Sequence, residues 1–218
     1  MAVKTVPIRE SLERSWTIFK NNPLFLVVLF VVVSMVYGII GKADEMADRF
    51  IWPAGLLVRV GYIVALAIVE LGVVSVALKL VDHGKAVFDD LFSQFGVFFK
   101  FLITFILYSA MVGVGLVFLI VPGVYLAIKF GFFGFAIIDD ELEPLDALRA
   151  SSRLTDGVKL DLFMFYLAVA LVLFAGLILL VVGVYIAWPV TQVAIAHVYR
   201  DLKSQTGEAS AAGAPGRA

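Results

Sequence analysis

Cysteine is absent from the chain, and histidine occurs only twice, at His83 and His197. Without cysteine, disulfide bonds, thiolate metal sites and a cysteine nucleophile are excluded, and two histidines are too few for a histidine-rich zinc site. The sequence also lacks a His-Glu-x-x-His metal motif and a recognisable nucleophile paired with a base. We therefore expect a protein that is not an enzyme and that holds no metal or other cofactor.

Charged residues are scarce, at 16% of the chain, whereas hydrophobic residues make up 62% and the mean hydropathy is +1.02. Soluble globular proteins have roughly 25% charged and about 45–50% apolar residues. The net charge is -1 and acids are interleaved with bases, which argues against a nucleic-acid partner. The composition predicts an integral membrane protein whose partners are membrane lipids.

Long apolar runs divide the chain into spans, because a helix needs about 20 apolar residues to cross a hydrocarbon core of about 30 Å. The first predicted span is Pro23 to Ile40, and the second runs from about Leu56 to Leu78. The run from Phe101 to Ile138 would be on the order of 57 Å long as a helix, so it must hold two spans. Val121-Pro122-Gly123 lies near its middle and is where we expect the turn.

The last apolar run, Leu162 to Ala196, is on the order of 52 Å long at helical rise and is also divided into two spans, with the turn at Gly183. One tilted span with a re-entrant segment is the alternative for this run. The sequence thus predicts an all-α membrane protein with six transmembrane helices. Residues 1–203 form its single integral membrane domain, and residues 204–218 form a disordered cytoplasmic tail.

Basic residues set the expected orientation, since Lys and Arg accumulate on the cytoplasmic side. With the N-terminus inside, 13 basic residues lie inside and three outside, while Lys129 falls in a span. We therefore expect a multi-pass protein of a prokaryotic cytoplasmic or inner membrane, with both termini cytoplasmic. The inside residues are Lys4, Arg9, Arg14, Lys20, Lys79, Lys85, Lys100, Arg149, Arg153, Lys159, Arg200, Lys203 and Arg217; the outside ones are Lys42, Arg49 and Arg59.

Three inside segments resemble one another, and each precedes a pair of spans. They contain Glu10-Ser11-Leu12, Asp89-Asp90-Leu91 and Asp146-Ala147-Leu148. In the first, apolar residues recur at helical spacing; they are Ile8, Leu12, Trp16 and Phe19. Such a helix beside a span lies in the headgroup plane. The six spans are accordingly expected as three hairpin-like units, each preceded by a cytoplasmic interfacial amphipathic helix.

Glu70 lies well inside the second predicted span, where a charge costs on the order of 3 kcal/mol on insertion scales. Lys129 is the expected partner, because it also lies within a span, and Arg59, about 16 Å away along the helix axis, is the second choice. These two buried charges, Glu70 and Lys129, form either a structural pair or a functional site. The functional alternatives are a proton or ion relay and a binding site for a lipid headgroup.

Two further polar groups are candidates. Thr191, Gln192 and His197 follow Pro189 in the last predicted span, where hydrogen bonds across helices are the expected role of the first two. An acidic run after the fourth span could bind a divalent cation, although a solvated loop is the commoner outcome of such a pattern. Its residues are Asp139, Asp140, Glu141, Glu143 and Asp146.

Several stretches resemble a known family, notably Val121 to Phe130, Ile137 to Asp140 and Pro144 to Gly157, together with Glu10 to Trp16 and Ala196 to Leu202. The pattern is similar to a group of uncharacterised prokaryotic integral-membrane proteins that includes the membrane region of some glycerophosphoryl diester phosphodiesterases. The resemblance implies the membrane fold and no catalytic residues, since catalysis in such phosphodiesterases belongs to a separate soluble domain.

From these patterns we expect a non-catalytic polytopic membrane protein that acts as a membrane scaffold or a lipid-associated module. A homo-oligomer or a membrane-protein partner is compatible with that role. The alternative is a small transporter or channel that uses Glu70 and Lys129. A transporter should have a water-lined cavity that reaches those charges, whereas a scaffold should have a dry, packed core.

Overall fold

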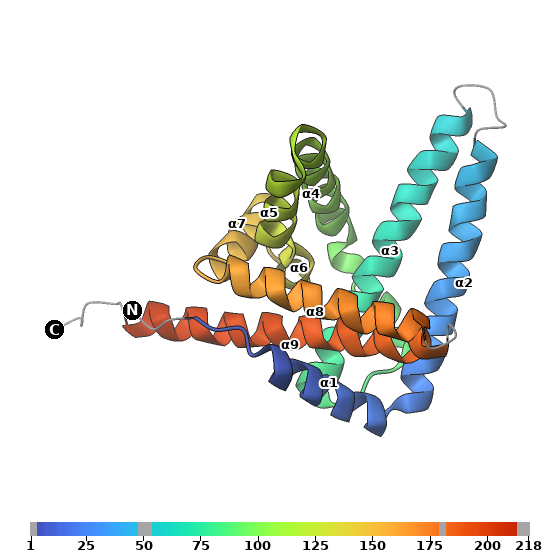
Figure 1. Ribbon diagram of the computed structural model, residues 1–218. Coiled ribbons are helices and arrows are strands. Elements are labelled where there is room, and N and C mark those ends of the chain that lie inside the picture. Colours follow the sequence, from blue (N-terminus) through green and yellow to red (C-terminus); the bar gives the residue numbers. More distant parts are fainter. Residues whose placement is uncertain (1–3, 48–53, 179–181, 213–218) are drawn as a thin grey trace.

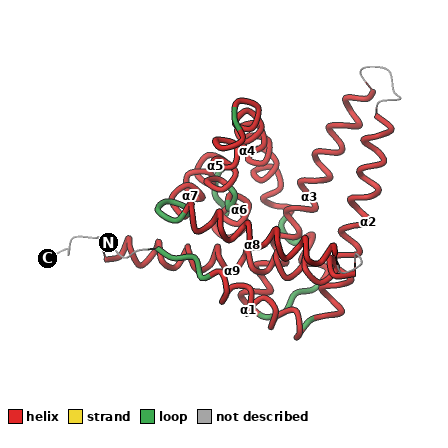
Figure 2. The backbone as a smooth tube through the Cα atoms, viewed as in Figure 1, coloured by secondary structure: helices red, strands yellow, loops and turns green. Residues whose placement is uncertain are grey.

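A computed structural model describes residues 4–47, 54–178 and 182–212, and all of the regular secondary structure in these ranges is helical. The helices are joined by short loops (Figure 2). The α-helices are α1 (Ile8–Asn21), α2 (Pro23–Ala47), α3 (Ala54–His83), α4 (Phe98–Phe118), α5 (Ile120–Phe130), α6 (Phe133–Asp140), α7 (Pro144–Leu154), α8 (Lys159–Ile178) and α9 (Val182–Ala212). Two short 3₁₀ helices, η1 (Phe88–Phe92) and η2 (Phe95–Val97), precede α4. The expected all-α fold is confirmed.

Five helical stretches are long and apolar enough to cross a membrane. They are Pro23–Lys42, Ala54–His83, Phe88–Phe118, Ile120–Asp140 and Lys159–Ile178. Within the described residues α9 is not one of them, so the structure supports five of the six predicted spans by length and composition, and the sixth stays a prediction.

The helices pair as three antiparallel hairpins, α2–α3, α4–α5 and α8–α9, and the members of each pair are in contact. In Figure 1 the first two hairpins extend away from the α8–α9 pair, which lies across their lower ends, and α1 lies along α9. Residues 48–53, which connect α2 to α3, and residues 179–181, which connect α8 to α9, lie outside the described residues.

The turn between α4 and α5 lies at Leu119, whose extended backbone (φ -161°, ψ 143°) separates the two helices. The predicted turn at Val121-Pro122-Gly123 is thus two to four residues too late. Pro122 lies in the first turn of α5, where a missing N–H breaks no helical hydrogen bond. Gly123 instead serves close packing, since a Cβ on it would lie 2.7 Å from the backbone nitrogen of Leu116 on α4.

The α8–α9 hairpin has the same kind of contact near its turn. A Cβ added to Gly183 would lie 2.8 Å from the Cα of Gly176. Gly183 was expected to form the turn itself, but it is the second residue of α9. Its role in the structure is to let the two helices approach each other.

The segments that precede the hairpins differ from one another. α1 and α7 are α-helices, whereas the second segment forms the short η1 and η2 in place of the expected α-helix. The buried face of α1 is made by Ser11, Ser15 and Phe19, and Trp16 of the predicted apolar stripe is exposed. Small serine side chains allow α1 to lie close against α9, a contact that hydrophobic periodicity does not reveal.

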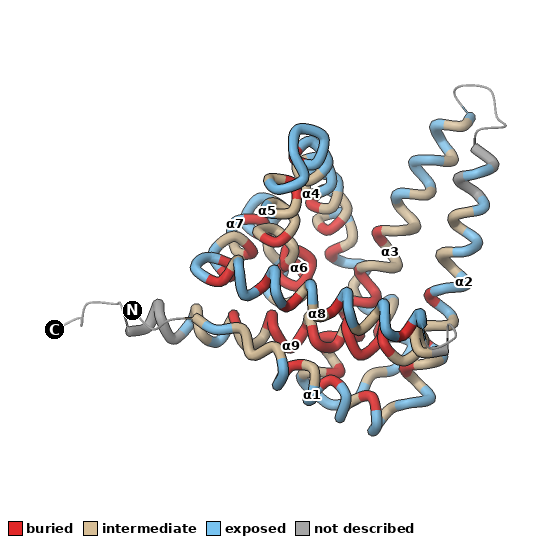
Figure 3. Tube along the Cα trace, viewed as in Figure 1, coloured by how far each residue is buried: buried red, intermediate tan, exposed pale blue. Residues whose placement is uncertain are grey.

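α9 is the central helix, since it contacts α1, α2, α3, α7 and α8. Its middle residues are buried, and Figure 3 shows this burial in contrast to the exposed upper parts of the other hairpins. Tyr199 and Leu202 of α9 pack with Phe132 and Phe165 in one apolar cluster. α9 continues through residues 204–212, which were expected to belong to a disordered tail; residues 213–218 lie outside the described residues.

Candidate functional site: a polar clamp at the base of the hairpins

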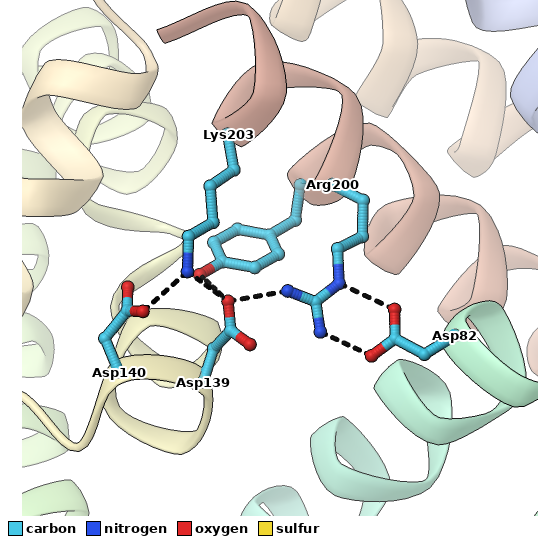
Figure 4. Close-up of polar contacts among 6 residues, drawn as sticks. Asp82, Asp139, Asp140, Arg200 and Lys203 are labelled. Carbon is cyan, nitrogen blue, oxygen red and sulfur yellow. Dashed lines mark hydrogen bonds and ion pairs between the residues drawn. The ribbon is translucent and has the colours of Figure 1, made fainter. Parts of the chain in front are cut away.

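The ends of α3 and α6 meet α9 at a cluster of polar side chains, which we call the polar clamp and define as Asp82, Asp139, Asp140, Tyr199, Arg200 and Lys203 (Figure 4). Arg200 is at its centre. Its Nε donates a hydrogen bond of 2.8 Å to Asp82 at the end of α3, and its Nη1 donates one of 2.6 Å to Asp139 at the end of α6. One guanidinium therefore joins α3, α6 and α9.

Lys203 extends the clamp by one helical turn. Its ammonium donates to Asp139 and, over 2.6 Å, to Asp140. Arg200 and Lys203 are three residues apart on α9, a spacing that places both on one face of a helix. That face meets the last turn of α6, where two adjacent carboxylates receive both cations.

Tyr199 forms the buried wall of the clamp. Its side chain is fully buried, its ring stacks on Phe135 at 5.1 Å between centroids, and its hydroxyl donates a hydrogen bond of 3.1 Å to Asp139. The carboxylate of Asp139 thus has three donors, from Tyr199, Arg200 and Lys203. A buried carboxylate needs such compensation, because an unpaired charge in a low-dielectric site is costly.

The two cations of the clamp remain charged. Burial alone would lower the pKa of Arg200, but the neighbouring carboxylates of Asp82 and Asp139 raise it. Likewise, burial opposes the charge of Lys203, and its carboxylate partners raise its pKa. Because these groups hold their protons so firmly, they are poor proton donors and acceptors near neutral pH. The clamp is suited to holding helices together, not to acid–base catalysis.

Other polar contacts lie at the ends of the same hairpins. Asn22, before α2, donates a hydrogen bond of 3.0 Å to the carbonyl of Gly84, after α3. Lys100 of α4 forms an ion pair of 2.8 Å with Glu143, after α6. The open ends of the first two hairpins, where each hairpin begins and finishes, are therefore joined by these polar contacts as well as by the clamp.

The N-terminal segment before α1 forms polar contacts with α7 and α9. Thr5 and Gln205 exchange two hydrogen bonds, of 2.9 Å from the Thr5 amide and 3.1 Å from the Gln205 side chain. Lys4 donates a hydrogen bond of 2.9 Å to the carbonyl of Arg153, near the end of α7. Residues near both ends of the chain consequently meet each other and α7 on one side of the molecule.

Glu70 and Lys129, the two expected partners, have different neighbours in the structure. Glu70 accepts a hydrogen bond of 2.7 Å from the hydroxyl of Tyr37 on α2, and Lys129 lies over the ring of Phe130 at 5.0 Å. No ion pair within 4.0 Å joins Glu70 to Lys129 among the residues that the structure describes. The phenol of Tyr37 gives the carboxylate of Glu70 a donor within its own hairpin.

The backbone of Lys129 has a structural role. Its carbonyl accepts hydrogen bonds from Ser151 (3.1 Å) and Thr155 (3.2 Å) of α7, and Ser151 also accepts one from the amide of Phe132. These hydroxyls satisfy backbone groups that the break between α5 and α6 leaves open.

The three polar candidates of α9 lie in different surroundings. Thr191 is buried and donates to the carbonyl of Trp188 in its own helix over 2.8 Å, where a bond to another helix was expected. Gln192 borders a small gap of about 10 Å³ between α2, α3 and α9. His197 lies about two helical turns beyond Pro189 on α9, and the three candidates share no hydrogen bond among the described residues, so they do not form one site.

A second buried polar group lies between α1 and α9. The Ser11 Oγ, the His197 Nε2 and the Asp201 Oδ2 are buried and have no hydrogen-bond partner among the described residues. Burial lowers the pKa of His197, and the positive charge of Arg14 lowers it further against the opposing effect of Asp82. Burial also raises the pKa of Asp201, which Arg14 partly offsets. Both side chains are thereby shifted toward their neutral forms.

The acidic run does not form a cation site in the described part of the chain. Four of its five carboxylates are paired with bases: Asp139 and Asp140 in the clamp, Glu143 with Lys100, and Asp146 with Arg149 over 3.1 Å. No group of three or more metal-ligating side chains that could hold an ion occurs among the described residues.

The clamp was not predicted as a unit. Asp139 and Asp140 were noticed as an acidic run, and Arg200 and Lys203 as inside charges, but nothing in the spacing showed that they meet. A signal that could have found it is the presence of acidic residues at the ends of two predicted helices together with two basic residues, three positions apart, on a later helix.

Comparison of the chain with protein-family models, with curated proteins and with solved structures finds no match.

Proposed function

We propose that this chain is a non-catalytic, lipid-associated membrane scaffold with six spans, arranged as three hairpins on a common polar base. Short segments before each hairpin, namely α1, η1–η2 and α7, would lie in the headgroup layer on the cytoplasmic side. The proposal includes kinship with the membrane region of some glycerophosphoryl diester phosphodiesterases, which the sequence pattern suggests.

An even number of crossings is supported by the meeting of the two ends of the chain. Thr5 and Gln205 are hydrogen-bonded, so they lie on the same side of any membrane that the chain crosses. Five crossings would separate them, whereas a sixth crossing by α9 returns the chain to its starting side.

The composition of α9 fits a span that is shielded by the other helices. Helices in contact with lipid must be apolar on their outer face, but a helix surrounded by protein can carry small and polar residues. α9 is enclosed by five other helices, and Thr191 and His197 are buried in these contacts. Its lower hydropathy is therefore compatible with a central position in a bundle.

The observation that carries the proposal is a group of exposed aromatic side chains beside α4. Phe88, Phe92, Phe95 and Phe99 are 40–74% exposed on η1, η2 and the start of α4. α4 has 21 residues and is about 32 Å long at helical rise, enough to cross the core alone. The preceding turns are then left at the membrane surface, with their aromatic rings toward the lipid.

The exposed faces of α1 and α7 carry ion pairs beside single apolar side chains, Trp16 on α1 and Leu145 on α7, as expected at a headgroup layer. Arg9 and Glu13 on α1 form a solvent-facing pair, and Asp146 and Arg149 do so on α7. A cavity of about 200 Å³ between α2, α3 and η1 is lined by apolar residues and does not include Glu70 or Lys129. These features favour a scaffold with a dry interior over a transporter.

The depth of η2 in a bilayer tests the proposal. Because the chain has no cysteine, single-cysteine variants can be spin-labelled without a background. We expect a label at Phe95→Cys to lie at headgroup depth, measured by its relative accessibility to oxygen and to a water-soluble nickel reagent in nanodiscs. Ile106→Cys, on an exposed face in the middle of α4, is the control for the hydrocarbon core, and Ser204→Cys, exposed near the end of α9, is the control for water. If the Phe95 label were as accessible to nickel as the Ser204 label, the interfacial placement would be wrong.

A further inference from the structure

A groove opens between α2 and α3 above η1, with a volume of about 200 Å³. Val36 and Ile40 line it from α2, Ala65 and Ile68 from α3, and Phe92 from η1. Every lining residue is Val, Ile, Leu, Phe, Ala or Gly. The lining offers no side-chain hydrogen bond, so it can recognise only hydrocarbon.

Close packing at Gly72 sets the lower end of the groove. A Cβ on Gly72 would lie 2.6 Å from the carbonyl oxygen of Leu91, so glycine allows η1 to press against α3 here. Above this contact Ala65 is too small to reach α2, and the two helices leave space between them. The groove is thus formed by the packing of α2, α3 and η1, and is not a gap at a chain end.

The size of the groove restricts its occupant. An apolar cavity of about 150 Å³ stays dry and binds a hydrocarbon such as benzene, so water is a poor occupant of this larger one. α2 and α3 are in contact along this hairpin, so a helix from a second copy of the chain cannot enter between them without separating them. A flexible hydrocarbon chain is thin enough to lie in the groove.

Membrane lipid around α2 and α3 would supply such a hydrocarbon chain. α2 and α3 both have the length and composition of membrane spans, and the groove is open at lining residues that are themselves partly exposed, Val32 at 38% and Phe92 at 59%. In a bilayer this opening faces lipid tails. Phe92 also belongs to the aromatic surface proposed above to lie at the headgroup layer, which places the groove within reach of a lipid anchored there.

We propose that the α2–α3 groove binds one acyl chain of a membrane phospholipid. The inference rests on the proposed membrane function and adds to it a defined lipid site. An acyl chain held between α2, α3 and η1 would fill the groove and would contact both η1 and the α2–α3 hairpin.

Native mass spectrometry of the full chain tests this inference. The protein is taken from nanodiscs of palmitoyl-oleoyl phosphatidylcholine and phosphatidylglycerol into mild detergent, and the mass of any retained molecule identifies it. We expect one phospholipid per wild-type chain. Ala65→Phe fills the groove and should lower the lipid-bound fraction about tenfold, equivalent to about 1.4 kcal/mol. Ala170→Phe places the same ring at an exposed position of α8 and should leave retention unchanged.

Val36→Phe fills the groove from the opposite wall and replaces Ala65→Phe if that variant does not fold, as judged by circular dichroism and gel filtration. Wild-type chains without phospholipid, chains that carry only detergent or a free fatty acid, or a dimer mass that disappears on filling the groove would each overturn the inference. Equal loss in Ala65→Phe and Ala170→Phe would do the same. An empty groove combined with a Phe95 label at headgroup depth would leave the proposed function intact.

Discussion

At the scale of single residues, Arg200 is the side chain on which most contacts between distant segments depend. It bonds carboxylates on α3 and α6 from α9, and its side chain is 27% exposed while that of Asp139 is 15% exposed. Loss of one partner of a buried ion pair costs roughly 3–5 kcal/mol, and an exposed pair contributes about 0.2–1 kcal/mol. The free-energy contribution that we expect from the clamp lies between these two values.

We expect Arg200→Met to lower the free energy of unfolding by about 2 kcal/mol, because it leaves Asp82 without its ion-pair partner and leaves Asp139 with Lys203 alone. Unfolding of the protein in nanodiscs or mild detergent measures this loss. Arg149→Met is the matched control, since Arg149 is 71% exposed and pairs with its neighbour Asp146. Adding Asp82→Asn to Arg200→Met should recover part of the loss. Equal, small effects of the two arginine substitutions would show that the clamp does not stabilise the fold.

Residue-scale prediction from sequence was strongest for placement along the chain and weakest for partners. Glu70 was correctly recognised as a charge within an apolar helix, and its need for a partner was inferred from the cost of burying it. The expected partner was a cation, whereas the structure supplies the hydroxyl of Tyr37. That pairing depends on how α2 and α3 lie against each other, which no local pattern encodes.

At the scale of helices and turns, hydrophobic length predicted five of the helices that are long and apolar enough to cross a membrane, because the cost of unbonded backbone in lipid forces long apolar runs into helices, and the sixth span stays a prediction. The turn positions were less predictable. Proline and glycine together indicated a turn at 121–123, but the chain turns at Leu119. The determining interaction is the approach of Gly115 to Gly123, a contact between two helices and not a property of the turn itself.

We expect Gly123→Ala to destabilise the protein by about 1–3 kcal/mol, the usual cost of overpacking, because its Cβ would collide with Leu116. The matched control is Gly113→Ala on the same hairpin, where a Cβ would have no neighbour within 4 Å. There, the better helix propensity of alanine should leave stability unchanged or raise it by up to about 1 kcal/mol. Thermal unfolding in the same nanodiscs compares the two, and a neutral Gly123→Ala would mean that the α4–α5 hairpin can open without cost.

At the scale of the whole molecule, the proposed six crossings can be tested at the two ends of the chain, which are hydrogen-bonded through Thr5 and Gln205. We expect cysteines at Thr5, Arg149 and Ser204 to react with an impermeant maleimide from one side of sealed membrane vesicles, and a cysteine at Lys42 from the other side. Right-side-out and inverted vesicles measure the two sides separately. Labelling of the Thr5 and Ser204 variants from opposite sides would contradict six crossings and require an odd number.

The polar clamp also determines when the molecule can be completed. Asp82, Asp139 and Asp140 all precede Arg200 and Lys203 in the chain, so a ribosome makes the three carboxylates of the clamp before either of its cations. Proteins generally form their N-terminal parts first during synthesis. The three carboxylates therefore remain without these two cations until α9 has been made, and the contacts that join α3, α6 and α9 cannot form before then.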